Sequence, residues 1–297
     1  MTGELQMNNS TLIACIQRLK RGEQAELSFL SPIVSAGLAA WFLEHPSSRA
    51  RVRLSGDAVR YSDGIGFSSL LKGDVRPSPA ALPRSTMSPL TSLTSPAEVD
   101  SCNERVTSIL RDMLTMEQQA SAEPLRRLVG ELHDNVASHA NGRGYSALQV
   151  YAERAEFAIC DFGHGFLRNV RRVEPTIDTH EKAIGWALVR GNTTARPRDP
   201  FAQRTGDDWE EQTEYNHHMG IGLWRLIQLV ERTAGTLWIW SGDATYQRNG
   251  GEYSFRSSPV IWPGVMIELG VPKMETPPVL GDFSREDLEA VASELGI

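Results

Sequence analysis

The stretch Glu156-Phe-Ala-Ile-Cys-Asp161-Phe-Gly163-His-Gly165 decides how this chain is expected to fold. Its first half is an apolar run that ends in an acid, which predicts a buried β-strand over 156–161. Two glycines follow at once, and glycine permits backbone conformations and close approaches that side chains forbid. The strand therefore carries the Asp161 carboxylate to a tight turn where a ligand can approach the backbone.

A helix expected over 125–140, just before this strand, carries three polar side chains on one face. Glu131, Asn135 and His139 are four residues apart, so they point the same way. An amide oxygen can fill one coordination position of Mg²⁺, and a carboxylate can deprotonate an attacking water or hydroxyl. Asn135 is therefore the candidate magnesium ligand and Glu131 the candidate catalytic base.

A second glycine pair, Gly220-Ile221-Gly222, precedes a strong helical pattern that continues through Leu223 to Ala234. Backbone N–H groups at a helix N-terminus beside glycines bind phosphate. The pattern is not a dinucleotide fingerprint, because Arg225 stands where the third glycine would be. The pair therefore predicts a phosphate-binding turn of another kind.

The remaining patterns predict an α/β protein in two parts. A β-α-β-α order over 25–75, which favours a partly parallel sheet, indicates a small α/β domain at residues 1–75, and a Pro/Ser-rich linker follows at 76–98. Further expected elements are a helix at 99–116, strands at 147–151, 236–241, 252–255 and 265–270, and a short C-terminal helix at 284–295. A polar segment at 190–217 is expected to be a loop.

Composition limits the classes of function. Hydrophobic residues make up 40% of the 297 residues and the net charge is -7, which argues against a general affinity for nucleic acid or acidic membrane. No apolar run approaches the ~20 residues that cross a bilayer. The N-terminus lacks the pattern of a signal peptide, and the three dispersed cysteines are typical of reduced thiols. A cytoplasmic protein without nucleic-acid or membrane partners is expected.

The order of these motifs resembles the GHKL superfamily, which includes gyrase-type topoisomerases, heat-shock chaperones, histidine kinases, mismatch-repair ATPases and anti-sigma kinases. The resemblance covers about residues 99–272. Glu131-x-x-x-Asn135 is similar to the N box, Asp161-x-Gly163-x-Gly165 to the G1 box and Gly220-x-Gly222 to the G2 box. The strand-like segments at 235–241 and 264–269 are similar to the pair that closes the family's sheet.

The resemblance implies a Bergerat-type two-layer α/β sandwich over 99–275, with a mixed sheet, helices on one face, and a tail at 276–297. It implies ATP and Mg²⁺ as ligands, with Asn135 on the metal and Asp161 on adenine. The other residues it assigns to the nucleotide are His139, Gly163, Gly165, Gly220, Ile221, Gly222 and Leu223. The segment between Arg168 and Met219 is implied to be the lid over ATP.

Two departures from the family pattern stand out. Gly264 is followed by Val265, where many members have a threonine that touches the adenine region. The implied lid is also long and hydrophilic. Its arginines either reach the γ-phosphate or keep a loop solvated; they are Arg190, Arg196, Arg198 and Arg204.

Glu131-Leu-His133-Asp134 also looks like the phosphoacceptor box of one histidine-kinase class. In that class a whole N box separates the histidine from the G1 box, and too few residues lie between His133 and Asp161 for that. His133 is therefore expected on the helix surface, and autophosphorylation on histidine is disfavoured.

The N-terminal segment Leu27-Ser-Phe-Leu-Ser-Pro32, followed by a helix, is similar to small STAS-type domains. Such domains pair with anti-sigma GHKL ATPases in bacteria, so the fusion implies a self-contained switch; an unrelated α/β extension is the alternative.

The expected function is an ATP-dependent regulatory switch with slow hydrolysis and a protein partner or homodimer. A serine/threonine protein kinase and a non-catalytic, nucleotide-stabilised module are the alternatives.

Overall fold

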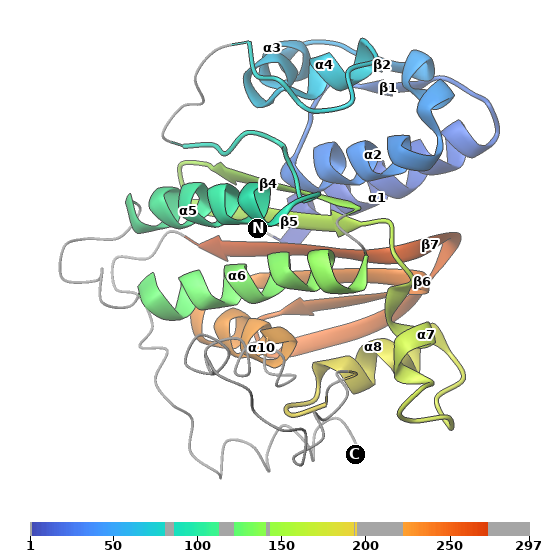
Figure 1. Cartoon of the computed structure of the whole chain (residues 1–297), viewed down its shortest axis with the longest axis vertical. Coiled ribbons are helices and arrows are strands. Elements are labelled where there is room, and N and C mark those ends of the chain that lie inside the picture. The colour runs from blue at the N-terminus through green and yellow to red at the C-terminus, as the bar shows by residue number, and fades with distance from the viewer. Residues whose placement is uncertain are drawn as a thin grey trace, which may run out of the picture.

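The computed structural model describes residues 2–80, 86–112, 122–140, 143–192, 194 and 222–272. Its centre is a five-stranded sheet of order β3-β4-β5-β7-β6, and helices cover both faces (Figure 1). The strands are β3 (Thr91–Ser92), β4 (Gly144–Val150), β5 (Arg154–Asp161), β6 (Thr236–Asn249) and β7 (Glu252–Pro272). The α/β sandwich expected from the sequence is thereby confirmed.

One face of the sheet is covered by helices α5 (Pro96–Asp112), α6 (Ala122–His139) and α10 (Gly222–Thr233). The opposite face is covered by α1 (Thr2–Lys20) and α2 (Pro32–Glu44). Two short helices, α7 (Gly165–Val170) and α8 (His180–Leu188), lie at the end of the sheet where β6 and β7 extend beyond the other strands (Figure 1).

Two details of the expected sandwich are wrong. Each strand pair described in this sheet is antiparallel, so the sheet is not mixed. Helices also cover both faces instead of one, because the central strands are apolar on both sides. On β5, Phe157 and Ile159 face α6 and its neighbours, whereas Ala158 and Cys160 face α1 and α2. A strand buried on both faces needs a layer on each.

The N-terminal segment forms a second, two-stranded sheet of β1 (Ala25–Leu27) and β2 (Val52–Leu54). The pair is parallel, as the β-α-β order predicts. It is completed by the 3₁₀ helix η1 (Pro46–Arg51) and by α3 (Asp57–Ile65) and α4 (Phe67–Leu71), which are separated at Gly66. Helix α2 packs against β4 and β5, so one hydrophobic cluster joins this segment to the large sheet.

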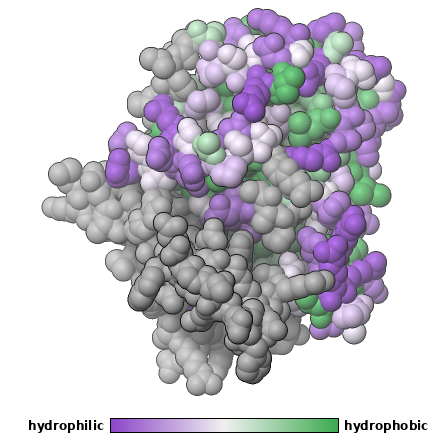
Figure 2. Space-filling view, viewed as in Figure 1, coloured by the Kyte–Doolittle hydropathy of each residue, from purple (hydrophilic) through white to green (hydrophobic). Residues whose placement is uncertain are grey.

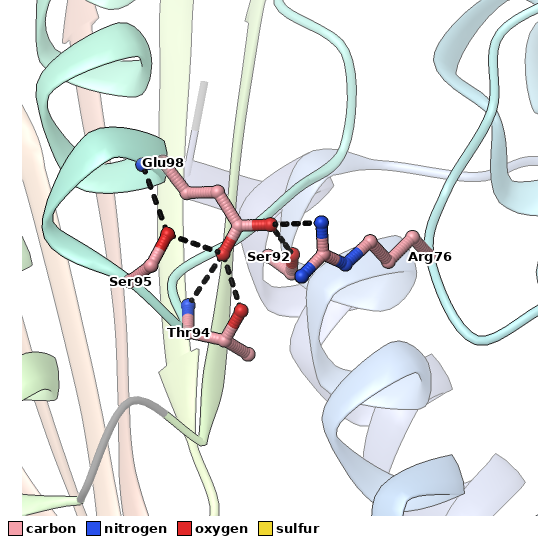
Figure 3. A network of polar contacts seen from close by, with 5 residues as sticks. All are labelled: Arg76, Ser92, Thr94, Ser95 and Glu98. Atoms are coloured by element: carbon pink, nitrogen blue, oxygen red, sulfur yellow. Dashed lines mark hydrogen bonds and ion pairs between the residues drawn. The ribbon is translucent and has the colours of Figure 1, made fainter.

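The start of α5 is fixed by hydrogen bonds of Ser95 and Glu98 that also hold the end of the Pro/Ser-rich segment (Figure 3). Ser95 Oγ accepts the Glu98 N–H at 3.4 Å, while the Glu98 carboxylate accepts the Thr94 N–H at 3.1 Å. Arg76 lies 3.3 Å from the same carboxylate. Burial opposes ionisation of Glu98, but the hydrogen bonds from Thr94 and Ser92 outweigh it and lower its pKa. The helix therefore begins at Pro96, three residues before the expected start.

Two glutamates are buried beneath α1. Glu156 on β5 and Glu268 on β7 lie on the same face of neighbouring strands, where Glu156 is opposite Gly270 and Glu268 is opposite Ala158. Arg154 forms an ion pair with Glu156 at 2.8 Å. Burial, and then the charge of Glu156, raise the pKa of Glu268 well above its ordinary value, against the opposing effects of Asn9 and Arg154.

Glu268→Gln should therefore stabilise the fold at pH 8 by about 1–3 kcal/mol and have little effect near pH 4. In the unfolded chain this carboxyl ionises near pH 4.5, whereas the fold keeps it protonated to higher pH, so the wild type loses stability as the pH rises. Urea unfolding at both pH values measures the difference. Glu252→Gln, at an exposed position on the same strand, is the control; equal effects of the two variants at pH 8 would contradict the explanation.

The surface seen in Figure 2 is mainly hydrophilic over its described part, with hydrophobic residues scattered among charged ones. The exposed large apolar side chains come from separate parts of the chain: Phe29, Val59, Val75, Val173, Tyr253 and Ile261. Among the described helices, none has the length and apolar character needed to span a bilayer.

Candidate functional site

The turn after β5 holds Asp161 at the end of the strand, as the sequence predicts. Its Oδ1 accepts the Gly163 N–H at 2.8 Å, which fixes the direction of the carboxylate. The Trp262 indole Nε1–H, from β7, donates to the Asp161 main-chain carbonyl oxygen at 2.9 Å. Side chain and main chain of this residue are therefore both held in place.

Asp161 as a whole residue is half-buried, and burial of its carboxyl raises the pKa to about 7 against the opposing hydrogen bonds from the Gly163 and Val265 N–H groups. Near neutral pH the group is thus balanced between its neutral and ionised forms. A ligand that donates a hydrogen bond to it would favour the ionised form.

Glycines allow the neighbouring backbone to pack closely against this carboxyl. A Cβ on Gly264 would lie 2.3 Å from both Asp161 O and Asp161 Oδ1, and 2.7 Å from Gly163 N. A Cβ on Gly163 would lie 2.8 Å from Ala140 Cβ. Strands β5 and β7 and the end of α6 therefore approach one another more closely here than any side chain would allow.

Gly165 lies at the start of α7 with φ +66°, in the left-handed region that favours glycine. A Cβ there would be 2.7 Å from Ser241 Oγ. That buried hydroxyl donates to Gly264 O at 3.0 Å and accepts the Phe166 N–H at 3.2 Å. Ser241 thus joins β6, β7 and the Gly163–Gly165 turn, a connection that the sequence did not reveal.

Helix α6 runs along one side of the candidate site. At its C-terminal end, Ala140 touches the Gly163 turn. Nine residues earlier, about 14 Å along a helix, Glu131 Oε1 accepts a hydrogen bond from Arg225 Nη1 at 2.8 Å. Arg225 belongs to the first turn of α10, so α6 connects the Asp161 turn with the start of α10.

Glu131 is almost fully enclosed, at 6% exposure, whereas the side chain of Arg225 is 36% exposed. A buried carboxylate is costly unless it is paired, and the guanidinium provides that pairing. The sequence predicted Glu131 as a functional residue but gave no sign of Arg225, because 94 positions separate the two.

Asn135 lies one turn after Glu131 on α6 and is half-buried. No group of three or more His, Cys, Asp or Glu suited to a metal occurs in the described ranges. Magnesium does not require such a group, because it keeps several waters and takes one or two protein ligands plus phosphate oxygens. The chemistry of Asn135 therefore fits a Mg²⁺ that is held chiefly by a nucleotide.

Other predicted site residues are only partly described. Gly222 begins α10, and Leu223 is half-buried against the cluster beneath that helix. Gly220, Ile221 and the side chain of His139 lie outside the described residues, as do Arg196, Arg198 and Arg204 of the implied lid and the tail at 276–297. Arg190 is described, with its guanidinium 5.1 Å from the centre of the Trp224 ring.

The expectation that His133 lies on the helix surface is wrong. Its side chain has 0% exposure and packs between α5, α6 and β4. Nε2 lies 2.8 Å from Ser146 Oγ, and Nδ1 contacts Asn103 Oδ1. Burial lowers its pKa to about 3. The helix buries two faces, one against the sheet and one against α5, so a residue next to the apolar stripe is enclosed as well.

An aromatic cluster lies directly behind the Asp161 turn. Phe162 packs edge-on against Trp262 with ring centroids 5.0 Å apart, and against Trp41 at 6.4 Å and His45 at 6.3 Å. Trp41 and His45 belong to the end of α2 and its cap. The turn that presents Asp161 on one side therefore contacts the N-terminal segment on the other.

Comparison with known proteins returned no match to a family model, to a curated protein or to a solved structure.

Proposed function

We propose that this chain binds ATP with Mg²⁺ and acts as a nucleotide-dependent regulatory switch of the GHKL type. The observation that carries the proposal is the arrangement around Asp161. A strand-end carboxyl, packed closely against Gly163 and Gly264, lies beside the C-terminal end of α6, and Glu131 lies in the middle of that helix beside the start of α10.

Each part of this arrangement suits a part of the nucleotide. The Asp161 carboxylate accepts a hydrogen bond from the exocyclic amino group of adenine, which guanine lacks at that position. Asn135, half-buried one turn from Glu131, contributes its amide oxygen to Mg²⁺. The first N–H groups of α10 have no partners within the helix and point toward an anion, so they suit phosphate.

Hydrolysis assigns a role to Glu131. The carboxylate takes a proton from water while the water oxygen attacks the γ-phosphorus and the bond to ADP breaks, which gives ADP and phosphate. A carboxylate has about four acceptor positions, and pairing with Arg225 through Oε1 uses one of them. Burial and ion pairing favour slow turnover.

Switching requires that a change at the nucleotide site reach another surface. Phe162 adjoins both Asp161 and the end of α2, so a movement of the turn would displace side chains of the N-terminal segment. Ordering of a segment by γ-phosphate contacts is a known switching device. A protein partner or a second copy of the chain would read the resulting surface.

The proposal is tested by titrating the protein with ATP, ADP and GTP, with and without Mg²⁺, in a calorimeter. Binding of ATP in preference to GTP, strengthened by Mg²⁺, is expected. Failure to bind any of the three would refute the proposal. Incubation with γ-labelled ATP and candidate partners then separates the chemistries, since free phosphate indicates hydrolysis and labelled protein indicates a kinase.

Asp161→Asn should weaken ATP binding at least tenfold, about 1.4 kcal/mol, because it replaces an acceptor with a group that both donates and accepts. The measurement is the Kd for ATP by calorimetry. Asp57→Asn, an exposed position in the N-terminal segment, is the control and should change nothing. Unaltered affinity in Asp161→Asn would remove the assignment of this residue to adenine.

A further inference from the structure

Arg225 lies where a positive charge is unfavourable on electrostatic grounds. It is the fourth residue of α10, within the first turn, where the helix dipole already places partial positive charge. Its ion pair with Glu131 offsets this cost, and Glu131 is in turn a buried charge that the pair stabilises. The two residues form a charged link between α6 and α10.

The pair leaves donors of Arg225 available. A guanidinium has five N–H donors in a planar fork, and the described bond to Glu131 uses one of them, on Nη1. The Arg225 side chain remains 36% exposed at the start of α10. Phosphate oxygens match such a fork in a bidentate arrangement.

The length of α6 indicates which phosphate would reach this position. The Asp161 turn meets the helix at Ala140, and Arg225 meets it at Glu131, about 14 Å away along the helix axis. A nucleotide with its adenine on Asp161 that extends along α6 brings its last phosphate nearest to Arg225. The terminal phosphate of ADP stops short of that point.

We propose that Arg225 is the residue by which this chain distinguishes ATP from ADP. Its free N–H donors bind the γ-phosphate while Glu131 holds the guanidinium in position. This inference rests on the proposed function, since it assigns the specificity of the same site. Glu131 then has two roles, because it orients Arg225 through Oε1 and is the candidate base.

Arg190 is a competing cation from the implied lid, because it lies beside the residue that precedes Arg225. Its guanidinium stacks on the Trp224 ring, on the same helix turn as Arg225, but the bond to Glu131 is made by Arg225. A cation–π contact attracts the guanidinium to the ring but does not direct its N–H donors as a carboxylate does. Replacing each arginine in turn therefore separates the two candidates.

The test measures the Kd values of ATP and ADP, each with Mg²⁺, for wild type and Arg225→Gln. Arg225→Gln should weaken ATP binding by about 10- to 100-fold and ADP binding by less than about threefold, because a charge-assisted bidentate contact is lost only with ATP. Arg225→Lys should recover part of the loss, since it keeps the charge but not the fork. Arg232→Gln, at an exposed position on the same helix, is the control and should leave both Kd values unchanged.

Equal weakening of ATP and ADP, or unchanged ATP binding, would overturn the inference. So would a selective loss of ATP binding in Arg190→Gln with none in Arg225→Gln. If the wild-type protein binds neither ATP nor ADP, that result refutes the proposed function itself. If Arg225→Gln fails to fold because the buried Glu131 loses this ion pair, the double variant Glu131→Gln/Arg225→Gln removes both charges, and the same loss of ATP-over-ADP preference is expected in it.

Discussion

Gly264→Ala should abolish measurable nucleotide binding and lower the free energy of unfolding by about 2 kcal/mol or more. The added methyl would lie 2.3 Å from two oxygens of Asp161, and one of these is the carboxylate oxygen that accepts the Gly163 N–H. Both contacts belong to the end of a strand that is hydrogen-bonded on its two sides, so the neighbours cannot move aside independently. Asp161 would be displaced.

Gly251→Ala is the matched control for this effect, because it lies on the turn between β6 and β7 with nothing within 4 Å of the added Cβ. Denaturant unfolding and ATP calorimetry on both variants measure the two consequences. Retention of full ATP affinity in Gly264→Ala would mean that the ligand does not use the Asp161 turn. A loss of stability without a loss of ATP affinity would mean that Gly264 is needed for the fold but not for nucleotide binding.

Acidification should destabilise the protein by about 3–5 kcal/mol through His133 alone between pH 6.5 and pH 3. Its pKa falls from 6.5 to about 3 because burial disfavours the charged ring. In the unfolded chain the imidazole takes up a proton near pH 6.5, whereas the fold keeps it neutral. The stability that this histidine contributes is therefore complete above pH 6.5 and is lost as the pH falls toward 3.

Urea unfolding from pH 7.5 to pH 4 measures this effect. His133→Gln should be less stable than wild type at pH 7.5 by about 1–3 kcal/mol, because the contacts to Ser146 and Asn103 are disturbed. The difference in the free energy of unfolding between wild type and His133→Gln should become smaller as the pH falls, because the variant has no imidazole to protonate. His164→Gln, on the exposed turn, should follow the wild-type curve. Parallel curves for wild type and His133→Gln would contradict the explanation.

The local part of the fold was predictable. The apolar run before Asp161, the spacing around Glu131 and the pattern after Gly222 gave β5, α6 and α10 within a few residues. These signals depend on neighbours in sequence, where periodicity reports burial directly. Helix α1 was missed, although Leu12, Ile16 and Leu19 have helical spacing and are buried, because its first half is polar.

The long-range part was not predictable. The strands expected at 252–255 and 265–270 are parts of one continuous strand, β7. The Ser257-Ser258-Pro259 segment between them lies within β7, and its pairing with β6 is shifted by a bulge near Gly242. The burial of His133 depends on α5, and the Glu131–Arg225 pair depends on the packing of α10 beside α6. Such contacts arise from tertiary packing, for which one sequence gives no periodic signal. Asp161, Gly163 and Gly165 could be singled out from the sequence because their chemistry is local to one turn, whereas Gly264 on β7 could not.

The shared hydrophobic cluster also has a consequence for inheritance. Trp240, Trp262 and Met266 on the sheet are buried by the same cluster that contains Trp41 and Phe42 of α2. A gene fragment that begins after the Pro/Ser-rich segment would encode a sheet with one hydrophobic face exposed to solvent. The N-terminal segment and the part that contains the large sheet are therefore expected to recombine, duplicate and diverge as a single unit, even though their sequences look like two separable modules.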